Sequence, residues 1–104
     1  MVVKRLYRFT AKEGMTREEF ADYWLKEVAP TVKQFPGLKK YTINIIIQTQ
    51  GEDPGYHGFG ELWWGSLKEM QDDLASPLAK KMVALMPNFV SKAVTQVVEE
   101  HVIK

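Results

Sequence analysis

Two side chains in this sequence are candidates for proton transfer, the carboxylate of Glu61 and the imidazole of His57. Glu61 lies in a run of aromatic and apolar neighbours, Phe59, Leu62, Trp63 and Trp64. Desolvation among such neighbours would raise the pKa of this carboxyl and make it a usable general acid or base. The alternative is a structural carboxylate that pairs with Arg5 or Arg8 on the first predicted strand.

A second group of side chains could hold and orient a substrate. Its aromatic members are Tyr7, Tyr23, Trp24 and Trp63. At these spacings each of them would line a pocket or, equally well, fill the core. Asn44 stands between two isoleucines and needs a hydrogen-bond partner if it is buried, and that partner is either backbone or a ligand. Gly58 and Gly60 either let a helix approach the sheet or leave room for a ligand.

We expect neither a metal site nor an organic cofactor. The chain has two histidines, His57 and His101. His57 and Glu61 share a strand face, but four residues along a strand span about 13 Å. Metal ligands lie about 2.0–2.3 Å from their ion, so these two side chains cannot share one. The sequence also lacks the glycine-rich phosphate loops and the nucleophile elbow of well-known cofactor and hydrolase sites.

Composition argues against several classes of protein. The 104 residues are enough for one domain, taken as residues 1–104. Lys and Arg total 14 and Asp and Glu total 13, and this balance argues against nucleic acid or an anionic membrane as a partner. The absence of cysteine excludes disulfides, thiolate metal sites and a cysteine nucleophile. No export signal and no apolar run of about 20 residues is visible, so we expect a cytoplasmic protein.

The elements that must position these residues follow from the periodicity of apolar side chains. Alternation predicts strands over residues 2–9, 41–48, 57–64 and 93–103. Apolar residues at intervals of three and four predict helices over residues 16–35 and 66–85. Pro30 cannot donate to the preceding turn, so the first helix should kink or restart near Ala29. Ser76 and Pro77, an N-cap followed by a first-turn proline, should restart the second helix.

The order β-α-β-β-α-β predicts an α+β protein with a ferredoxin-like fold, in which a four-stranded antiparallel sheet carries both helices on one face. Both faces of several strands nevertheless carry bulky apolar residues. The residues on one face are Ile46, Leu62 and Trp64, and those on the other are Ile45, Phe59 and Trp63. An uncovered apolar sheet face implies a partner. The natural partner is a second copy, so we expect a homodimer that packs through its sheet faces.

The ordered motifs resemble the EthD-domain family over nearly the whole chain. The segments that carry the resemblance are residues 14–20 with Tyr23 and Trp24, residues 36–38 with Tyr41 and Asn44, residues 61–67, 76–77 and 98–102. The resemblance implies a dimeric α+β barrel. Related enzymes use no metal or organic cofactor and act on small cyclic, often aromatic, compounds in a pocket between helices and sheet. Other members are encoded beside ether-degrading oxygenases.

One residue departs from the family pattern. The family usually carries a histidine just before Ala-Pro at the end of the first helix, whereas Val28 precedes Ala29 and Pro30 here. Valine neither donates nor accepts a proton, so we expect Val28 to contact a substrate only as part of the pocket wall. Glu61 or His57 would have to replace the histidine in any proton transfer.

Two functions stay open at this point. The first is a cofactor-free lyase or isomerase that acts on a small cyclic or aromatic compound, with Glu61 or His57 moving the proton. The second is a non-catalytic dimeric protein that binds a small hydrophobic or aromatic molecule, as an accessory to a degradation or biosynthesis pathway. A monooxygenase or a haem-handling protein is a third, less favoured reading, because the broader barrel superfamily contains both.

Overall fold

The computed structural model describes residues 2–104 and has the expected order of elements. The strands are β1 (Val3–Ala11), β2 (Leu38–Ile45), β3 (Gly58–Trp64) and β4 (Val90–Val98). The helices are α1 (Arg17–Tyr23), the π-helical turn η1 (Trp24–Val28), α2 (Ala29–Val32), α3 (Leu67–Leu74), α4 (Pro77–Leu85) and the short 3₁₀ turn η2 (Met86–Asn88). None of these helices is long and apolar enough to cross a membrane.

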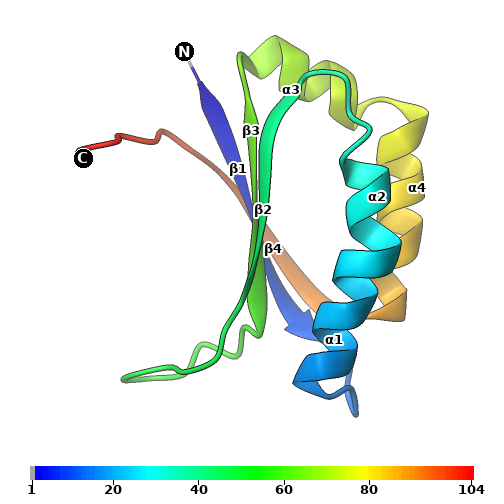
Figure 1. Cartoon of the computed structure of the whole chain (residues 1–104), viewed down its shortest axis with the longest axis vertical. Coiled ribbons are helices and arrows are strands. Elements are labelled where there is room, and N and C mark those ends of the chain that lie inside the picture. The colour runs from blue at the N-terminus through cyan, green and yellow to red at the C-terminus, as the bar shows by residue number, and fades with distance from the viewer. Residues whose placement is uncertain (1) are drawn as a thin grey trace.

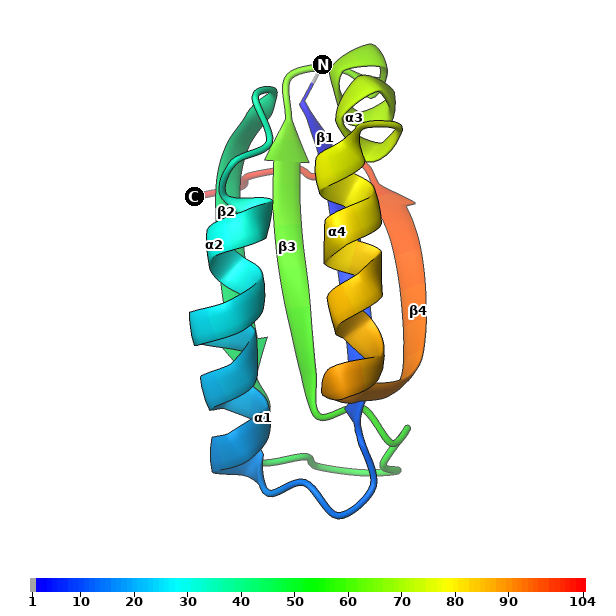
Figure 2. The ribbon, with the colours of Figure 1, turned by 90° about the vertical axis from the view of Figure 1, so that its right-hand side faces the viewer.

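The four strands form one antiparallel sheet in the order β2-β3-β1-β4, which confirms the ferredoxin-like fold. The helices cover one face of this sheet, and within residues 2–104 no helix covers the other (Figure 1). Seen from the helical side, the rod of α1 and α2 lies over β2 and β3, and α4 lies over β1 (Figure 2). We call the two sheet faces the helix face and the open face.

The first helix begins and breaks where the sequence predicts. The hydroxyl of Thr16 accepts a hydrogen bond from the backbone of Glu19, whose carboxylate accepts one from the backbone of Thr16, so the N-terminal capping box is complete. Pro30 lacks the N–H that would continue the α-helical pattern. The chain accommodates it with the turn η1, in which the backbone N–H of Ala29 bonds the carbonyl of Trp24. The helix then resumes as α2 at Ala29, as expected.

Two strands end earlier than alternation alone predicts. Ile45 pairs with Gly58 at the start of β3, and Val98 pairs with Lys4 near the start of β1. One further backbone hydrogen bond follows the first pair, from the N–H of Ile46 to the carbonyl of His57 at 3.0 Å. Residues 46–57 and 99–104 form two arms that extend past the open face (Figure 1).

The core lies between the helices and the helix face of the sheet. Its fully buried large side chains include Phe20, Trp24, Trp64 and Phe89. Gly58 and Gly60 make this packing possible. A Cβ atom at Gly58 would lie 2.8 Å from the carbonyl oxygen of Asn44 and 3.0 Å from the Trp24 ring, and one at Gly60 would also lie 3.0 Å from that ring. These glycines therefore let the helix approach the sheet, and Gly60 also lines the cavity described below.

Candidate functional site

The predicted site residues do not converge, because the pleat of the sheet sends them to opposite faces. Tyr7 and Trp24 lie on the helix face, and Val28 joins them from the turn η1. Glu61, Asn44 and Trp63 lie on the open face. His57 and Tyr23 belong to neither group. A substrate between helices and sheet therefore cannot be reached by Glu61.

A narrow cavity lies between the helices and the sheet. Tyr7, Trp24 and Val28 line it, together with Tyr41, Met82 and Met86. The remaining lining is apolar as well, and no carboxylate, imidazole or ammonium group lines this cavity in the part of the chain that the structure describes. Its volume is about 20 Å³, which is room for one water molecule. A bound organic molecule would therefore have to displace side chains from the wall.

Tyr41 supplies one of the two polar groups in the cavity wall. Its hydroxyl accepts a hydrogen bond of 2.9 Å from the indole nitrogen of Trp24. Burial raises the pKa of Tyr41 to about 12, although this hydrogen bond acts in the opposite direction. The phenol is therefore neutral at neutral pH. Sequence alone does not single out Tyr41 as a site residue, because it alternates with Ile43 and Ile45 on one strand face.

Tyr7 supplies the other polar group. Its hydroxyl accepts a hydrogen bond of 2.9 Å from Nε of Arg5, whose guanidinium also lies 5.2 Å from the centre of the Tyr7 ring. Burial raises the pKa of the Tyr7 phenol above its usual value, and the adjacent Arg5 offsets part of that rise. Both phenols in the wall can therefore donate or accept hydrogen bonds at neutral pH without carrying charge.

Val28 occupies the cavity wall as an apolar residue, and its exposed fraction is 2%. It ends the turn η1, the one π-helical segment in residues 2–104. Such turns are frequent at functional sites, because they displace one residue out of the regular helical register. Trp24, which begins the same turn, enters the cavity from the same side. The turn therefore directs both side chains into the cavity.

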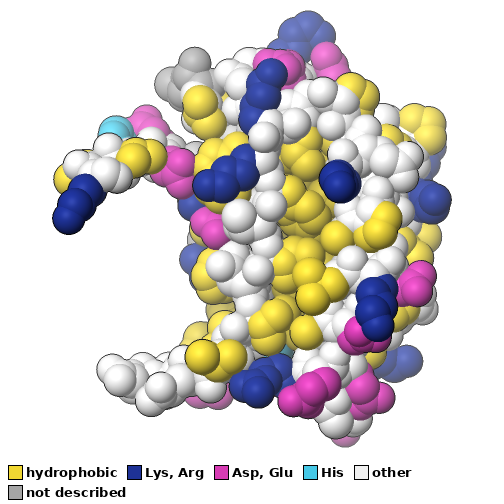
Figure 3. Space-filling view, viewed as in Figure 1, with side chains coloured by type: hydrophobic (Ala, Val, Ile, Leu, Met, Phe, Trp, Pro, Cys, Tyr) yellow, Lys and Arg dark blue, Asp and Glu magenta, His cyan; other side chains and the backbone are white. Residues whose placement is uncertain are grey.

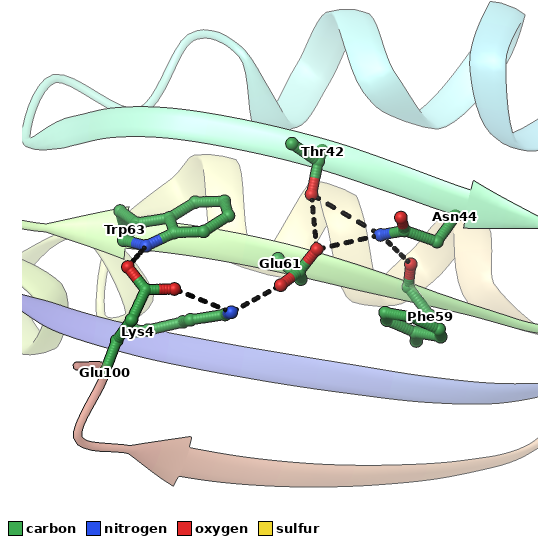
Figure 4. Close-up of polar contacts among 7 residues, drawn as sticks. All are labelled: Lys4, Thr42, Asn44, Phe59, Glu61, Trp63 and Glu100. Carbon is green, nitrogen blue, oxygen red and sulfur yellow. Dashed lines mark hydrogen bonds and ion pairs between the residues drawn. The ribbon is translucent and has the colours of Figure 1, made fainter. Parts of the chain in front are cut away.

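Glu61 is held by polar partners on the open face (Figure 4). It forms an ion pair with Lys4 and accepts hydrogen bonds from Thr42 at 2.9 Å and Asn44 at 3.0 Å. Burial raises the pKa of Glu61, but these bonds outweigh it and hold the pKa below its usual value. The expected raised pKa is therefore wrong, because the sequence did not show that three polar side chains from β1 and β2 meet this carboxylate.

The partner of Glu61 also differs from the sequence-based expectation of Arg5 or Arg8. Arg5 lies on the helix face, and Arg8 donates a 3.0 Å hydrogen bond to Gln96 on β4. Lys4 is the cation on β1 that reaches Glu61, and it also forms a 2.9 Å ion pair with Glu100. Burial lowers the pKa of Lys4, but its bonds to the two carboxylates more than compensate and raise that pKa.

Asn44 and Trp63 belong to the same polar cluster. The amide of Asn44 donates to the carbonyl of Phe59 at 3.1 Å as well as to Glu61, so its partners are backbone and a carboxylate (Figure 4). The indole nitrogen of Trp63 donates to Glu100 at 2.8 Å. Its ring lies under the ammonium groups of Lys4 and Lys40, at 4.8 and 4.7 Å from the ring centres. The polar atoms of this cluster therefore satisfy one another.

His57 and Tyr23 have separate surroundings. Nδ1 of His57 accepts a 2.8 Å hydrogen bond from the backbone of Ala11, at the end of the sheet where the arm 46–57 leaves it. The ring of Tyr23 packs against Phe89, with 5.3 Å between ring centres, and its hydroxyl accepts a bond from Asn88. Within residues 2–104 no three His, Asp or Glu side chains are placed to hold a metal ion.

A wider groove lies beside the cavity. Its volume is about 410 Å³, and it runs between α4 and the helix face of β1 and β4. Tyr7, Met82 and Met86 line both spaces. Methionine side chains are unbranched and adaptable, so these two can move to join the cavity to the groove. The candidate site is this pair of adjacent spaces.

Comparison with known proteins identifies the relatives of this arrangement. A family model described as the EthD domain matches residues 12–93. No curated protein matches the chain at a significant level.

Several solved structures share the fold. An ethyl tert-butyl ether D (EthD) family protein from Bacillus halodurans is 18% identical, with a TM-score of 0.82 over 97% of this chain and 100% of that one. A dimeric ferredoxin-like protein of unknown function from Thermobifida fusca is 11% identical, with a TM-score of 0.75 over 94% and 90%. SnoaB, a cofactor-independent oxygenase from Streptomyces nogalater, is 16% identical, with a TM-score of 0.65 over 96% and 93%.

Proposed function

The chain belongs to the EthD domain family, and from this premise we propose that it is a homodimeric protein that binds a small, largely apolar or aromatic molecule between its helices and its sheet. The observation that carries the proposal is the composition of the cavity wall. The wall is apolar except for two phenols, Tyr7 and Tyr41, and both have raised pKa values. Such a wall suits a largely apolar ligand.

The same wall argues for binding without proton transfer. A general base that works near neutral pH must change its charge near that pH, and neither phenol does so. The family's usual histidine position is filled by Val28, which supplies only a methyl-lined surface. Glu61 cannot compensate because it lies on the open face and is already paired with Lys4.

Ligand binding requires the cavity wall to open, and the wall would open toward the groove through movement of Met82 and Met86. The cavity of about 20 Å³ and the groove of about 410 Å³ are separated by Met82 and Met86, which line both. Rotation of these flexible side chains would merge the two spaces. The merged volume falls in the range of about 300–1,000 Å³ that small-molecule sites usually occupy.

The homodimer is proposed to form through the open faces. Leu6, Phe59, Val94 and Val98 place apolar side chains on this face. The two arms extend past it and leave a hollow between them (Figure 3). Ile47 on one arm and Ile103 on the other are 80% and 91% exposed, so a second copy seated in the hollow would cover them. The structural relative from Thermobifida fusca is itself described as dimeric.

A cofactor-free lyase or isomerase is the second candidate, and the pair of Tyr7 and Arg5 is the observation that favours it. A cation beside a buried phenol stabilises the phenolate, so this phenol is the group in the wall best suited to act as an acid. Oxygenation, the third reading, is a separate reaction class, and its support is the fold similarity to SnoaB, which is described as a cofactor-independent oxygenase.

Calorimetric titration with a panel of small aromatic compounds tests the proposal. Val28→Phe fills the cavity and should abolish binding, whereas Leu25→Phe on the exposed side of the same turn should leave binding unchanged. Circular dichroism checks that both variants are folded. Recovery of the ligand unchanged after long incubation supports binding, and conversion to product supports the enzyme. Absence of binding across the panel, or binding that survives Val28→Phe, would overturn the cavity as the site.

A further inference from the structure

The groove beside the cavity contains a cation whose role the proposed function does not explain. Helix α4 lies over β1 and leaves the helix face of the edge strand β4 uncovered, so Ala93 and Thr95 are exposed. The helical side of the groove is apolar and includes Met82, Val83 and Met86. Arg5 is the one charged residue among the described residues that line it.

Arg5 is held in place by neutral groups alone. Its Nε donates to the hydroxyl of Tyr7 at 2.9 Å, and its Nη2 donates to the hydroxyl of Thr95 at 3.3 Å. A guanidinium has more N–H donors than these two bonds use, so terminal donors remain for another acceptor. These two bonds also fix the plane of the guanidinium, because they act on different nitrogens.

Lys4, the neighbouring cation of β1, differs from Arg5 because it pairs with the carboxylates of Glu61 and Glu100 on the open face. Arg8 also bonds to a neutral group, the amide of Gln96, but it does not line the groove. In residues 2–104 no carboxylate forms an ion pair with Arg5. A guanidinium in an apolar groove without an anion is an incomplete ion pair, and a ligand can complete it.

We infer that the ligand is a small organic acid whose carboxylate binds to Arg5 and whose apolar body lies along Met82, Val83 and Met86. The planar guanidinium matches a carboxylate in shape, and one cation matches its single charge. The hydroxyl of Thr95 offers a further hydrogen bond beside it. This inference rests on the proposed function, because Tyr7, Met82 and Met86 join the groove to the cavity that would hold the rest of the ligand.

Calorimetric titration of the full chain with aryl and alkyl carboxylic acids and their matched primary amides tests the inference. At least one acid should bind about tenfold or more tightly than its amide, the difference expected for hydrogen bonds to a charged group. Arg5→Gln should remove this preference, and Arg5→Lys should retain part of it. Lys80→Gln removes an exposed cation of α4 that does not line the groove, and it should leave the preference intact.

The outcomes separate this inference from the proposed function. If acids and amides bind equally well, or if the preference survives Arg5→Gln, the role of Arg5 is overturned while binding of an apolar molecule stands. If neither acids nor amides bind, both are overturned. The comparison of acid with amide in the unaltered protein tests the class of ligand even if the Arg5 variants fail to fold.

Discussion

The indole nitrogen of Trp24 donates a hydrogen bond to the hydroxyl of Tyr41 across 2.9 Å, between the π-helical turn and strand β2. This hydrogen bond links the helical side of the cavity wall to its sheet side. Trp24 has an exposed fraction of 1%, so its indole N–H is buried and needs an acceptor, which the hydroxyl of Tyr41 provides. The bond therefore serves stability in the empty protein and places a phenol where a ligand could use it.

Removal of the Tyr41 hydroxyl should destabilise the protein. Tyr41→Phe leaves the buried indole N–H of Trp24 unpaired, and we expect a loss of about 1–3 kcal/mol in the free energy of unfolding. Tyr23→Phe is the matched control, because that hydroxyl bonds the exposed Asn88 and its removal should cost much less. Urea denaturation of both variants measures the difference. Equal losses would contradict the role assigned to Tyr41.

Glu61 should stabilise the protein in a pH-dependent way. Its pKa is lowered in the folded state, so its contribution is present above its ordinary value of 4.5 and is lost as the pH falls through the folded pKa. Glu61→Gln should therefore cost about 1–3 kcal/mol at pH 7 and progressively less below pH 4.5.

The exposed Glu18 provides the control for this experiment. Oε1 of Glu18 lies 3.8 Å from Nη2 of Arg17, and the Glu18 side chain is 79% exposed. Glu18→Gln should therefore change the free energy of unfolding little at any pH. Thermal unfolding from pH 3 to pH 7 compares the variants at one protein concentration. A cost of Glu61→Gln that grows toward acid would mean that the carboxyl is stabilised in its protonated form.

The open face should mediate dimerisation. Light scattering after size exclusion should give twice the chain mass of 12.0 kDa for the unaltered protein. Phe59→Glu places a charge on the open face and should yield a monomer, because an unpaired charge cannot be buried there without a large cost. Leu25→Glu places the same charge on the exposed side of the helices and should leave the dimer intact. The opposite result would assign the interface to the helices.

Restoration of the family histidine should not create an enzyme. Val28→His places an imidazole in an apolar cavity whose other polar groups are two phenols. Burial lowers the pKa of the imidazole, and the larger side chain overpacks the wall. We therefore expect the free energy of unfolding to fall by about 1–3 kcal/mol. Assays with small lactones and phenolic polyketides should detect no turnover. Turnover by Val28→His would show that this chain is a family enzyme that lost one catalytic residue.

The sequence predicted the fold well because the deciding signals are local. Pro30 and the pair Ser76 and Pro77 each act through neighbouring backbone groups, and the helices break or restart at these points. Alternation correctly separated Leu62 and Trp64 from Phe59 and Trp63, but it grouped Ile45 with Phe59, whereas Ile45 pairs with Gly58 and lies on the helix face. The helical segments restart at positions that depend on no distant contact.

The site was predicted less well because it depends on contacts between distant segments. Alternation divides the residues of a strand into two faces but does not say which face the helices cover. Glu61 was therefore judged by its aromatic neighbours in sequence, whereas Lys4 on β1 and Thr42 on β2 determine its pKa. Tyr41 was missed because its partner, Trp24, lies on a helix.

A crystal structure of the protein with the tightest ligand from the titration panel would show whether that ligand lies between the helices and the sheet. We expect density there, in contact with Trp24, Tyr41 and Val28. We also expect Met82 and Met86 to be rotated away from the positions in which they line both the cavity and the groove. Density only on the open face, or a ligand held at His57 with the cavity still closed at about 20 Å³, would contradict these expectations.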